Sequence, residues 1–109
     1  MRETLKKLKS QIMKCKEVAI FKFKEDFMDG AVELNKKLMS EMQNASNQSL
    51  LEFEVYQSSK DPTIFTWLID WTDSESAKET TDKWMSFPSN LKFSSSVEKD
   101  IFYDFLEKR

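Results

Sequence analysis

The sequence of 109 residues contains no histidine. The chain therefore has no imidazole general base, no Ser-His or Cys-His catalytic pair, and no histidine ligand for zinc or haem. Any chemistry must use carboxylates, Lys, Arg, Tyr, a thiol or the substrate itself. We expect no cofactor and no metal site.

Cysteine is nearly absent too, since Cys15 is the only one. A lone cysteine excludes an intramolecular disulfide and a thiolate metal cluster. It favours a reducing compartment, and we expect the cytoplasm. Lys14 and Lys16 flank Cys15, and two positive charges beside a thiol would lower its pKa. The alternative is a thiol without a function.

Long apolar runs are also missing. The uncharged apolar run at residues 65–69 is far too short to span a bilayer, and no secretory signal is expected. Hydrophobic residues make up 39% and charged residues 33%, which is typical of one globular domain. The net charge of -2 gives no case for nucleic-acid binding.

Positive charge is concentrated at the start of the chain. Residues 1–16 hold six basic side chains and one acidic one, so the remainder is acidic. Leu5, Leu8 and Ile12 lie near helical spacing, which predicts a short basic amphipathic helix over residues 1–16, before a domain over residues 17–109. Such a helix binds a membrane surface or an acidic partner, or packs on its own domain or a dimer mate.

Four segments alternate with a period of two and predict strands, at 17–24, 50–58, 63–72 and 97–106. In the second, Leu51 shares a face with Phe53. In the last, Ile101 shares a face with Tyr103, opposite Phe102. The segment 89–96 is predicted to be an extended loop.

Two helices are expected between these strands. The first follows a stripe from Met28 to Met42, with Asp26 or Asp29 as its N-cap and Asn44 or Asn47 in a left-handed C-cap. The second runs from residue 74 or 75 to about 85 behind the N-cap region 72–75. It is expected to bury Ala77, Thr81, Trp84 and Met85.

The resulting order, β-α-β-β-α-β, is that of the split βαβ unit, a ferredoxin-like α+β fold with a four-stranded antiparallel sheet. Two helices would cover only one face of this sheet. Large apolar residues on the other face would then meet water. We therefore expect a homodimer in which two sheets close into a dimeric α/β barrel.

Several motifs support a family resemblance. The run from Phe53 to Tyr56, the Asp61-Pro62 turn with Phe65, and the segment from Asp70 to Ala77 are similar in order and spacing to the antibiotic biosynthesis monooxygenase (quinol monooxygenase) family. The match covers about residues 17–107. The resemblance implies an oxidoreductase that oxidises an aromatic small molecule without a cofactor.

The sequence departs from the family pattern at two places. Family members usually carry a histidine one turn after the helix alanine, and Thr81 stands at the matching position. They often have a glycine before the second strand, where this chain has residues 47–49. The missing histidine also makes a haem-degrading relative a poor match.

The aromatic residues indicate a pocket between the sheet and the helices, suited to a flat quinol-type ligand. Its expected lining is Trp67, Trp71, Trp84, Phe21 and Phe23. An ordinary apolar core explains the same residues.

The catalytic residues are unknown, and the candidates are Asp70, Tyr56 and Thr81. A half-buried carboxylate has a raised pKa and acts as a base toward a phenol, whereas a solvated charge has no such role. The carboxylate pairs at residues 52/54 and 98/100 are expected to form ion pairs with lysines across the dimer, the alternative being a metal site or a shared proton. Two functions remain open: a cofactor-independent monooxygenase, and a non-catalytic dimeric-barrel module that binds a small hydrophobic ligand or a protein partner.

Overall fold

The computed structural model describes residues 14–109, and the helix predicted at the start of the chain lies almost wholly outside them. The elements follow in the order β1 (Cys15–Phe23), η1 (Glu25–Phe27), α2 (Ala31–Ala45), β2 (Leu50–Gln57), β3 (Ile64–Trp71), α3 (Ser74–Thr81), η2 (Trp84–Ser86), α4 (Asn90–Ser96) and β4 (Val97–Glu107), where η is a 3-10 turn.

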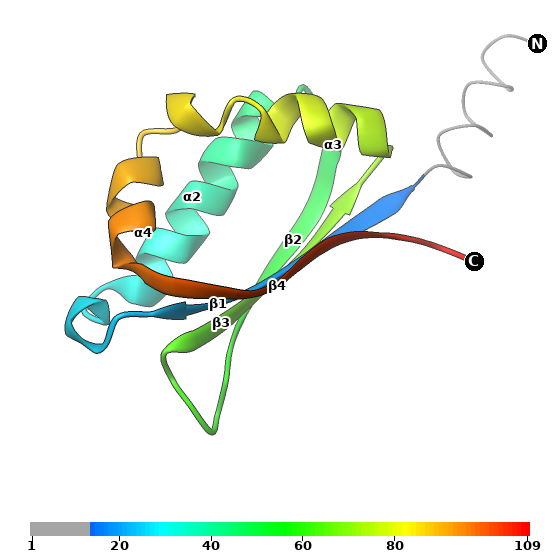
Figure 1. Cartoon of the computed structure of the whole chain (residues 1–109). Coiled ribbons are helices and arrows are strands. Elements are labelled where there is room, and N and C mark those ends of the chain that lie inside the picture. Colours follow the sequence, from blue (N-terminus) through cyan, green and yellow to red (C-terminus); the bar gives the residue numbers. More distant parts are fainter. Residues whose placement is uncertain (1–13) are drawn as a thin grey trace, which may run out of the picture.

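The strands form one antiparallel sheet in the order β2-β3-β1-β4. Helices α2, α3 and α4 cover one face of it, and the β2–β3 hairpin projects beyond them (Figure 1). The ferredoxin-like α+β fold predicted from the sequence is confirmed. No helix within residues 14–109 is long and apolar enough to cross a membrane.

The strand register separates the two faces of the sheet. Ala19 pairs with Trp67, and Phe21 with Phe65, on the face that the helices cover, which we call the inner face. Val18 pairs with Leu68 on the opposite, outer face. The alternation of β1 and β3 in the sequence predicts both faces correctly.

Two irregularities in the sheet correct the predicted faces. A register shift between Leu50 and Glu52 brings Leu50 into the core, 3% exposed, and leaves Leu51 40% exposed. A second shift in the β1–β4 pairing sets Asp100 opposite Phe21. Asp100 therefore lies on the inner face, the side on which strict alternation places Ile101.

Helix α3 is shorter than predicted, because it ends at Thr81 and a 3-10 turn replaces its last part. Thr80 and Thr81 donate their hydroxyls to backbone carbonyls of the same helix, a competition that weakens helices. The buried residues are Ala77 and Thr80, whereas Thr81 and Trp84 are half-buried and Met85 is 77% exposed.

The prediction of an extended loop over residues 89–96 is wrong, because Asn90–Ser96 form helix α4. The Glu41 carboxylate on α2 accepts hydrogen bonds from the Ser89 backbone N–H (2.9 Å) and hydroxyl (2.6 Å). Phe93 of α4 is buried, with its ring centroid 5.1 Å from that of Phe21. Distant contacts therefore stabilise a serine-rich helix that local propensity does not favour.

The ends of α2 use backbone conformations rather than the predicted acidic cap. Its N-cap is Gly30 at φ 71°, in place of Asp26 or Asp29. Beyond its C-terminus, Asn47 (φ 52°) has the predicted left-handed conformation, and Gln48 (φ 69°) shares it. Few non-glycine residues adopt this conformation, and asparagine is among those that do so most readily.

Asp73 caps α3 and gives a test of the fold. Its side chain accepts hydrogen bonds from the Ser76 backbone N–H (2.7 Å) and hydroxyl (2.9 Å), and from the Thr72 hydroxyl (2.9 Å). Burial opposes ionisation of Asp73, but these bonds outweigh it and hold the pKa of the carboxyl below its usual value.

The substitution Asp73→Ala should lower the free energy of unfolding by about 1 kcal/mol at pH 7. Because the pKa of Asp73 is lower in the folded state, ionised Asp73 stabilises the fold at pH values above the unfolded pKa of 3.8. This stabilisation is lost as the pH falls through the folded pKa. Urea unfolding should thus show the difference shrinking below about pH 4. Glu79→Ala, at an exposed position of the same helix, is the control. An equal loss in both variants contradicts the capping role.

Candidate functional site

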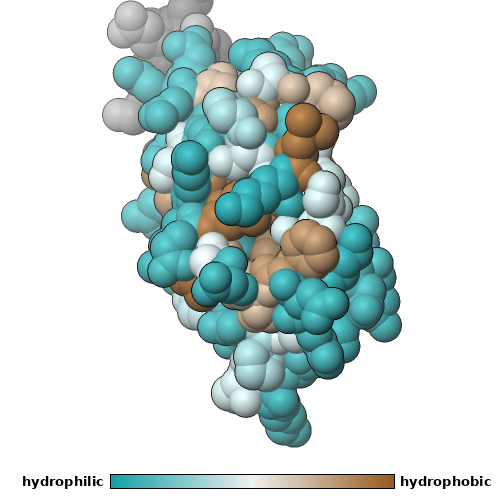
Figure 2. All heavy atoms as spheres, turned by 90° about the vertical axis from the view of Figure 1, so that its left-hand side faces the viewer, coloured by the Kyte–Doolittle hydropathy of each residue, from teal (hydrophilic) through white to brown (hydrophobic). Residues whose placement is uncertain are grey.

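A cavity of about 370 Å³ lies between the inner face of the sheet and the helices. Strands β1, β3 and β4 line it on one side, and residues of α2, α3, η2 and α4 on the other. Its size falls in the lower part of the range for small-molecule pockets, about 300–1,000 Å³. On the side of the molecule where α4 lies, apolar side chains gather in the middle of a hydrophilic surface (Figure 2).

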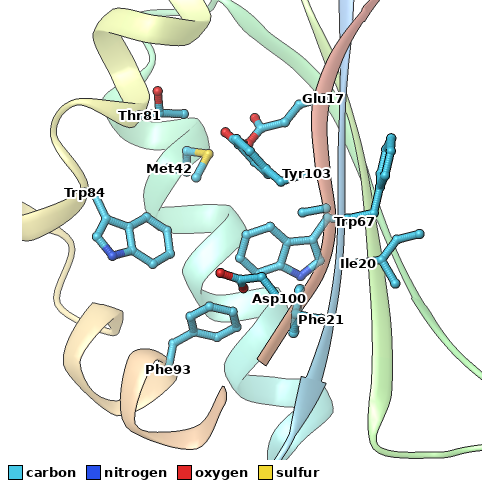
Figure 3. A pocket seen from close by; sticks show the side chains of 12 residues that line it. Glu17, Ile20, Phe21, Met42, Trp67, Thr81, Trp84, Phe93, Asp100 and Tyr103 are labelled. Atoms are coloured by element: carbon cyan, nitrogen blue, oxygen red, sulfur yellow. The ribbon is translucent and has the colours of Figure 1, made fainter. Parts of the chain in front are cut away.

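Aromatic rings line the cavity from both sides. Trp84 and Phe93 come from the helical side, and Trp67 and Tyr103 from the sheet, while Ile20 points away from the space (Figure 3). Ring centroids lie 5.0 Å apart for Trp67 and Phe93, and 5.8 Å apart for Trp84 and Phe93. Such spacing is typical of packed aromatic pairs.

A hydrogen bond to helix α2 holds the indole of Trp67 in place. Its Nε1 donates to Oδ1 of Asn35 (2.8 Å), and Nδ2 of Asn35 donates to the carbonyl of Ala31, one turn earlier in α2 (2.7 Å). Asn35 is fully buried, so breaking either bond leaves an unsatisfied polar group in the core. This wall of the cavity is therefore fixed before a ligand arrives.

Among residues 14–109, Glu17 is the one buried carboxyl group of the cavity lining, and it is only 2% exposed. Its Oε1 accepts a hydrogen bond from Nε1 of Trp71 (2.9 Å), and its Oε2 accepts one from the hydroxyl of Tyr103 (2.7 Å). One carboxyl group thus connects β1, β3 and β4.

The environment of Glu17 favours its protonated form. Burial raises the pKa of its carboxyl, and the hydrogen bonds from Tyr103 and Trp71 offset part of this increase. Within residues 14–109, no lysine or arginine forms an ion pair with it. Burial and the adjacent Glu17 charge also raise the pKa of Tyr103, whose hydroxyl remains a donor. The site can take up a proton at Glu17 and retain the one on Tyr103.

Sequence reasoning missed Glu17, although a signal for it was present. Glu17 stands two residues before Ala19 and four before Phe21, on the same face of an alternating strand. A charged residue at an inward position of a strand is unusual, because burying a carboxylate is unfavourable unless it is hydrogen-bonded. That anomaly marks a candidate functional residue.

Of the predicted pocket residues, the structure brings Phe21, Trp67 and Trp84 to the cavity. Trp71 reaches the site only through its hydrogen bond to Glu17, and Phe23 is a fully buried core residue.

The three catalytic candidates are separated. Thr81 lines the cavity, and its hydroxyl donates to the carbonyl of Lys78 (3.1 Å). Asp70 lies on the outer face, 3.4 Å from Nζ of Lys16, and Tyr56 lies on the same face, where it hydrogen-bonds Glu54.

Cys15 does not have the lowered pKa that its neighbouring lysines suggest. The thiol is buried, and burial, followed by the charges of Glu17, Asp73 and Glu107, raises its pKa to about 11. Lys14 and Lys16 are both exposed, and solvent weakens their influence on a buried thiol. No cluster of three metal-ligating side chains occurs in the part of the chain that the structure describes.

The raised pKa of Glu17 gives a testable pH dependence of stability. A folded pKa above the unfolded value of 4.5 means that the folded state holds the proton more tightly, so stability falls as the pH rises through this window. Glu17→Gln removes the titration and keeps the shape. Urea unfolding should show the variant gaining stability relative to the wild type as the pH rises above 4.5. Parallel pH curves contradict the buried-carboxyl description.

The comparisons with known proteins concern the fold. No family model matches the sequence, and no curated protein matches it. Solved structures do match. A protein from Chloroflexus aurantiacus, provisionally named antibiotic biosynthesis monooxygenase, is 15% identical, with a TM-score of 0.65 and coverage of 88% of this chain and 93% of that one.

A Nitrosomonas europaea protein with the same provisional name is 12% identical, with a TM-score of 0.66 and coverage of 87% and 89%. A Bacteroides thetaiotaomicron protein of unknown function, described as a possible oxidoreductase, is 14% identical, with a TM-score of 0.70 and coverage of 89% and 99%. Identities this low show the fold alone. The chain has the α+β fold of the antibiotic biosynthesis monooxygenases, which the motifs in its sequence resemble.

Proposed function

We propose that the cavity binds a flat hydroxyaromatic compound of the quinol type and that the protein oxidises it with dioxygen, without a cofactor. The observation that carries this proposal is the buried carboxyl of Glu17, set in an aromatic cavity with no basic partner among residues 14–109. A base of raised pKa in an apolar site is suited to proton transfer near neutral pH.

In the proposed reaction, Glu17 accepts the proton of a ring hydroxyl. The resulting electron-rich anion reduces dioxygen directly. One oxygen atom enters a ring carbon and the other leaves as water, so a quinol plus O₂ gives a hydroxyquinone plus water. The substrate supplies every electron, and the balance requires no external reductant.

The residues around Glu17 suit this role. Trp71 and Tyr103 each donate one hydrogen bond to a different carboxyl oxygen, which fixes the direction in which the group faces. Each carboxylate oxygen retains a second lone pair for a substrate proton. The rings of Trp67, Trp84 and Phe93 offer flat apolar contacts to the ring of the anion.

The proposal is tested by following oxygen consumption with a panel of quinols and anthrones. Glu17→Gln should lower kcat by about a hundredfold or more, because the general base is lost and the shape is kept. Glu33→Gln, at an exposed position on α2, should leave kcat unchanged. Absence of turnover with the whole panel, or equal rates for Glu17→Gln and the wild type, contradicts the oxygenase.

A non-catalytic binding module is the second candidate, and Thr81 favours it. This residue stands in the cavity where the resemblance leads one to expect a histidine, and its hydroxyl is occupied by the carbonyl of Lys78. A threonine hydroxyl, unlike an imidazole, does not act as a general acid or base near neutral pH. Tight binding of an aromatic ligand without oxygen uptake would favour this candidate.

We also propose that the chain forms a homodimer through the outer face of the sheet. Val18, Ile20 and Leu68 form the centre of this face, with Phe102 46% exposed and Leu106 43% exposed beside them. Lysines and carboxylates surround this apolar area, for example in the ion pair of Lys16 with Asp70. A self-complementary face of this kind suits a two-fold dimer.

Light scattering at micromolar concentration should therefore give twice the mass of one chain. Leu68→Lys places a charge in the middle of the outer face and should give a monomer. Leu91→Lys, on the exposed side of α4, should remain a dimer. A wild-type monomer, or a dimer that Leu68→Lys leaves intact, contradicts this interface.

The cytoplasmic location stays a prediction.

A further inference from the structure

The charge of the cavity lining has a single sign. Glu17 lies at its sheet side, and Asp100 contributes a second carboxylate from β4. Within residues 14–109, no lysine or arginine lines the cavity. An anionic ligand would meet the like charge of Asp100, and that of Glu17 whenever Glu17 is ionised, whereas a cationic ligand would meet a counter-charge.

The aromatic rings add to this preference. Trp84, Trp67 and Phe93 present their π-systems to the cavity, and Tyr103 stands beside Glu17 (Figure 3). The face of an aromatic ring is negative and attracts a cation, most strongly for tryptophan and when water is excluded. Recognition of organic ammonium groups by aromatic cages depends on this interaction.

The position of Asp100 is a product of the sheet irregularity. The register shift in the β1–β4 pairing sets Asp100 opposite Phe21, and its side chain points in among Trp67 and Phe93 (Figure 3). Asp100 is exposed, whereas Glu17 is buried, so the two carboxyl groups lie at the open and the closed parts of the cavity. A ligand can place a different polar group near each one.

We propose that the substrate class is a hydroxyaromatic amine, with a protonated amino group held by Asp100 and the tryptophan faces and a ring hydroxyl directed toward Glu17. This inference rests on the proposed function for the place of binding and for the role of the hydroxyl. The preference for a cation depends only on the carboxyl groups and aromatic rings that line the cavity.

The experiment compares three ligands that share a naphthol ring system and differ in one substituent: aminomethyl, hydroxymethyl or carboxyl. Binding is measured by titration calorimetry at pH 7.5 and low salt. The amine should bind about tenfold more tightly than the alcohol, and the carboxylate more weakly than both. High salt should reduce the advantage of the amine, since Asp100 is exposed.

Asp100→Asn should remove most of the preference for the amine and leave the affinity for the alcohol nearly unchanged. Asp104→Asn, which alters a carboxylate on the outer face, should leave both affinities as in the wild type. Thermal unfolding confirms that each variant is folded. Equal binding of amine and alcohol, tightest binding of the carboxylate, or no binding of any of the three at millimolar concentration overturns the inference.

Oxygen uptake separates this inference from the proposed function. Preference for the amine with no oxygen consumption supports the cation site and contradicts the oxygenase. Turnover of neutral quinols with no preference for the amine contradicts the cation site and leaves the oxygenase standing.

Discussion

The arrangement of this domain depends on one buried carboxyl group. Glu17 of β1 accepts hydrogen bonds from Trp71 of β3 and Tyr103 of β4, so it fixes two large aromatic side chains on neighbouring strands. A buried carboxylate loses its hydration, and only well-placed donors compensate for this loss. The donors here are uncharged, which offsets the burial only in part and leaves the pKa raised. The same contacts that order the sheet therefore prepare a proton acceptor at the cavity.

The cavity depends on features that interrupt regular structure. Helix α3 ends at Thr81, and the following turn brings Trp84 to the cavity. The short helix α4 places Phe93 beside Trp67, and a register shift turns Asp100 inward. A longer α3 and a regular β4 would change which side chains face this space. Local irregularities of this kind often position functional side chains.

The sequence predicts the fold better than it predicts the site. Strand alternation and the Asp73 cap are local signals, and they give the element order, the register faces of β1 and β3, and the start of α3 correctly. Helix α4 is missed because its stability comes from Glu41 and from packing around Phe93, which are contacts distant in sequence. The register shifts are missed because alternation carries no information about them. The candidate bases Asp70 and Tyr56 are chosen by residue type, although alternation along β3 already sets Asp70 on the face opposite Trp67.

The retention of Glu17 bears on whether the cavity is functional. An apolar side chain of similar size would fill the same position without desolvating a charge, and replacement of buried ionic groups by apolar ones is often neutral or stabilising. Trp71 and Tyr103 would both lose an acceptor: Tyr103 is 54% exposed and can bond to water, whereas Trp71 is fully buried and its indole N–H would stay unpaired. A destabilising group beside a cavity is typical of sites where stability is exchanged for activity. Glu17 therefore combines its structural hydrogen bonds with the proposed chemical role, and the aromatic walls indicate what kind of molecule it would face.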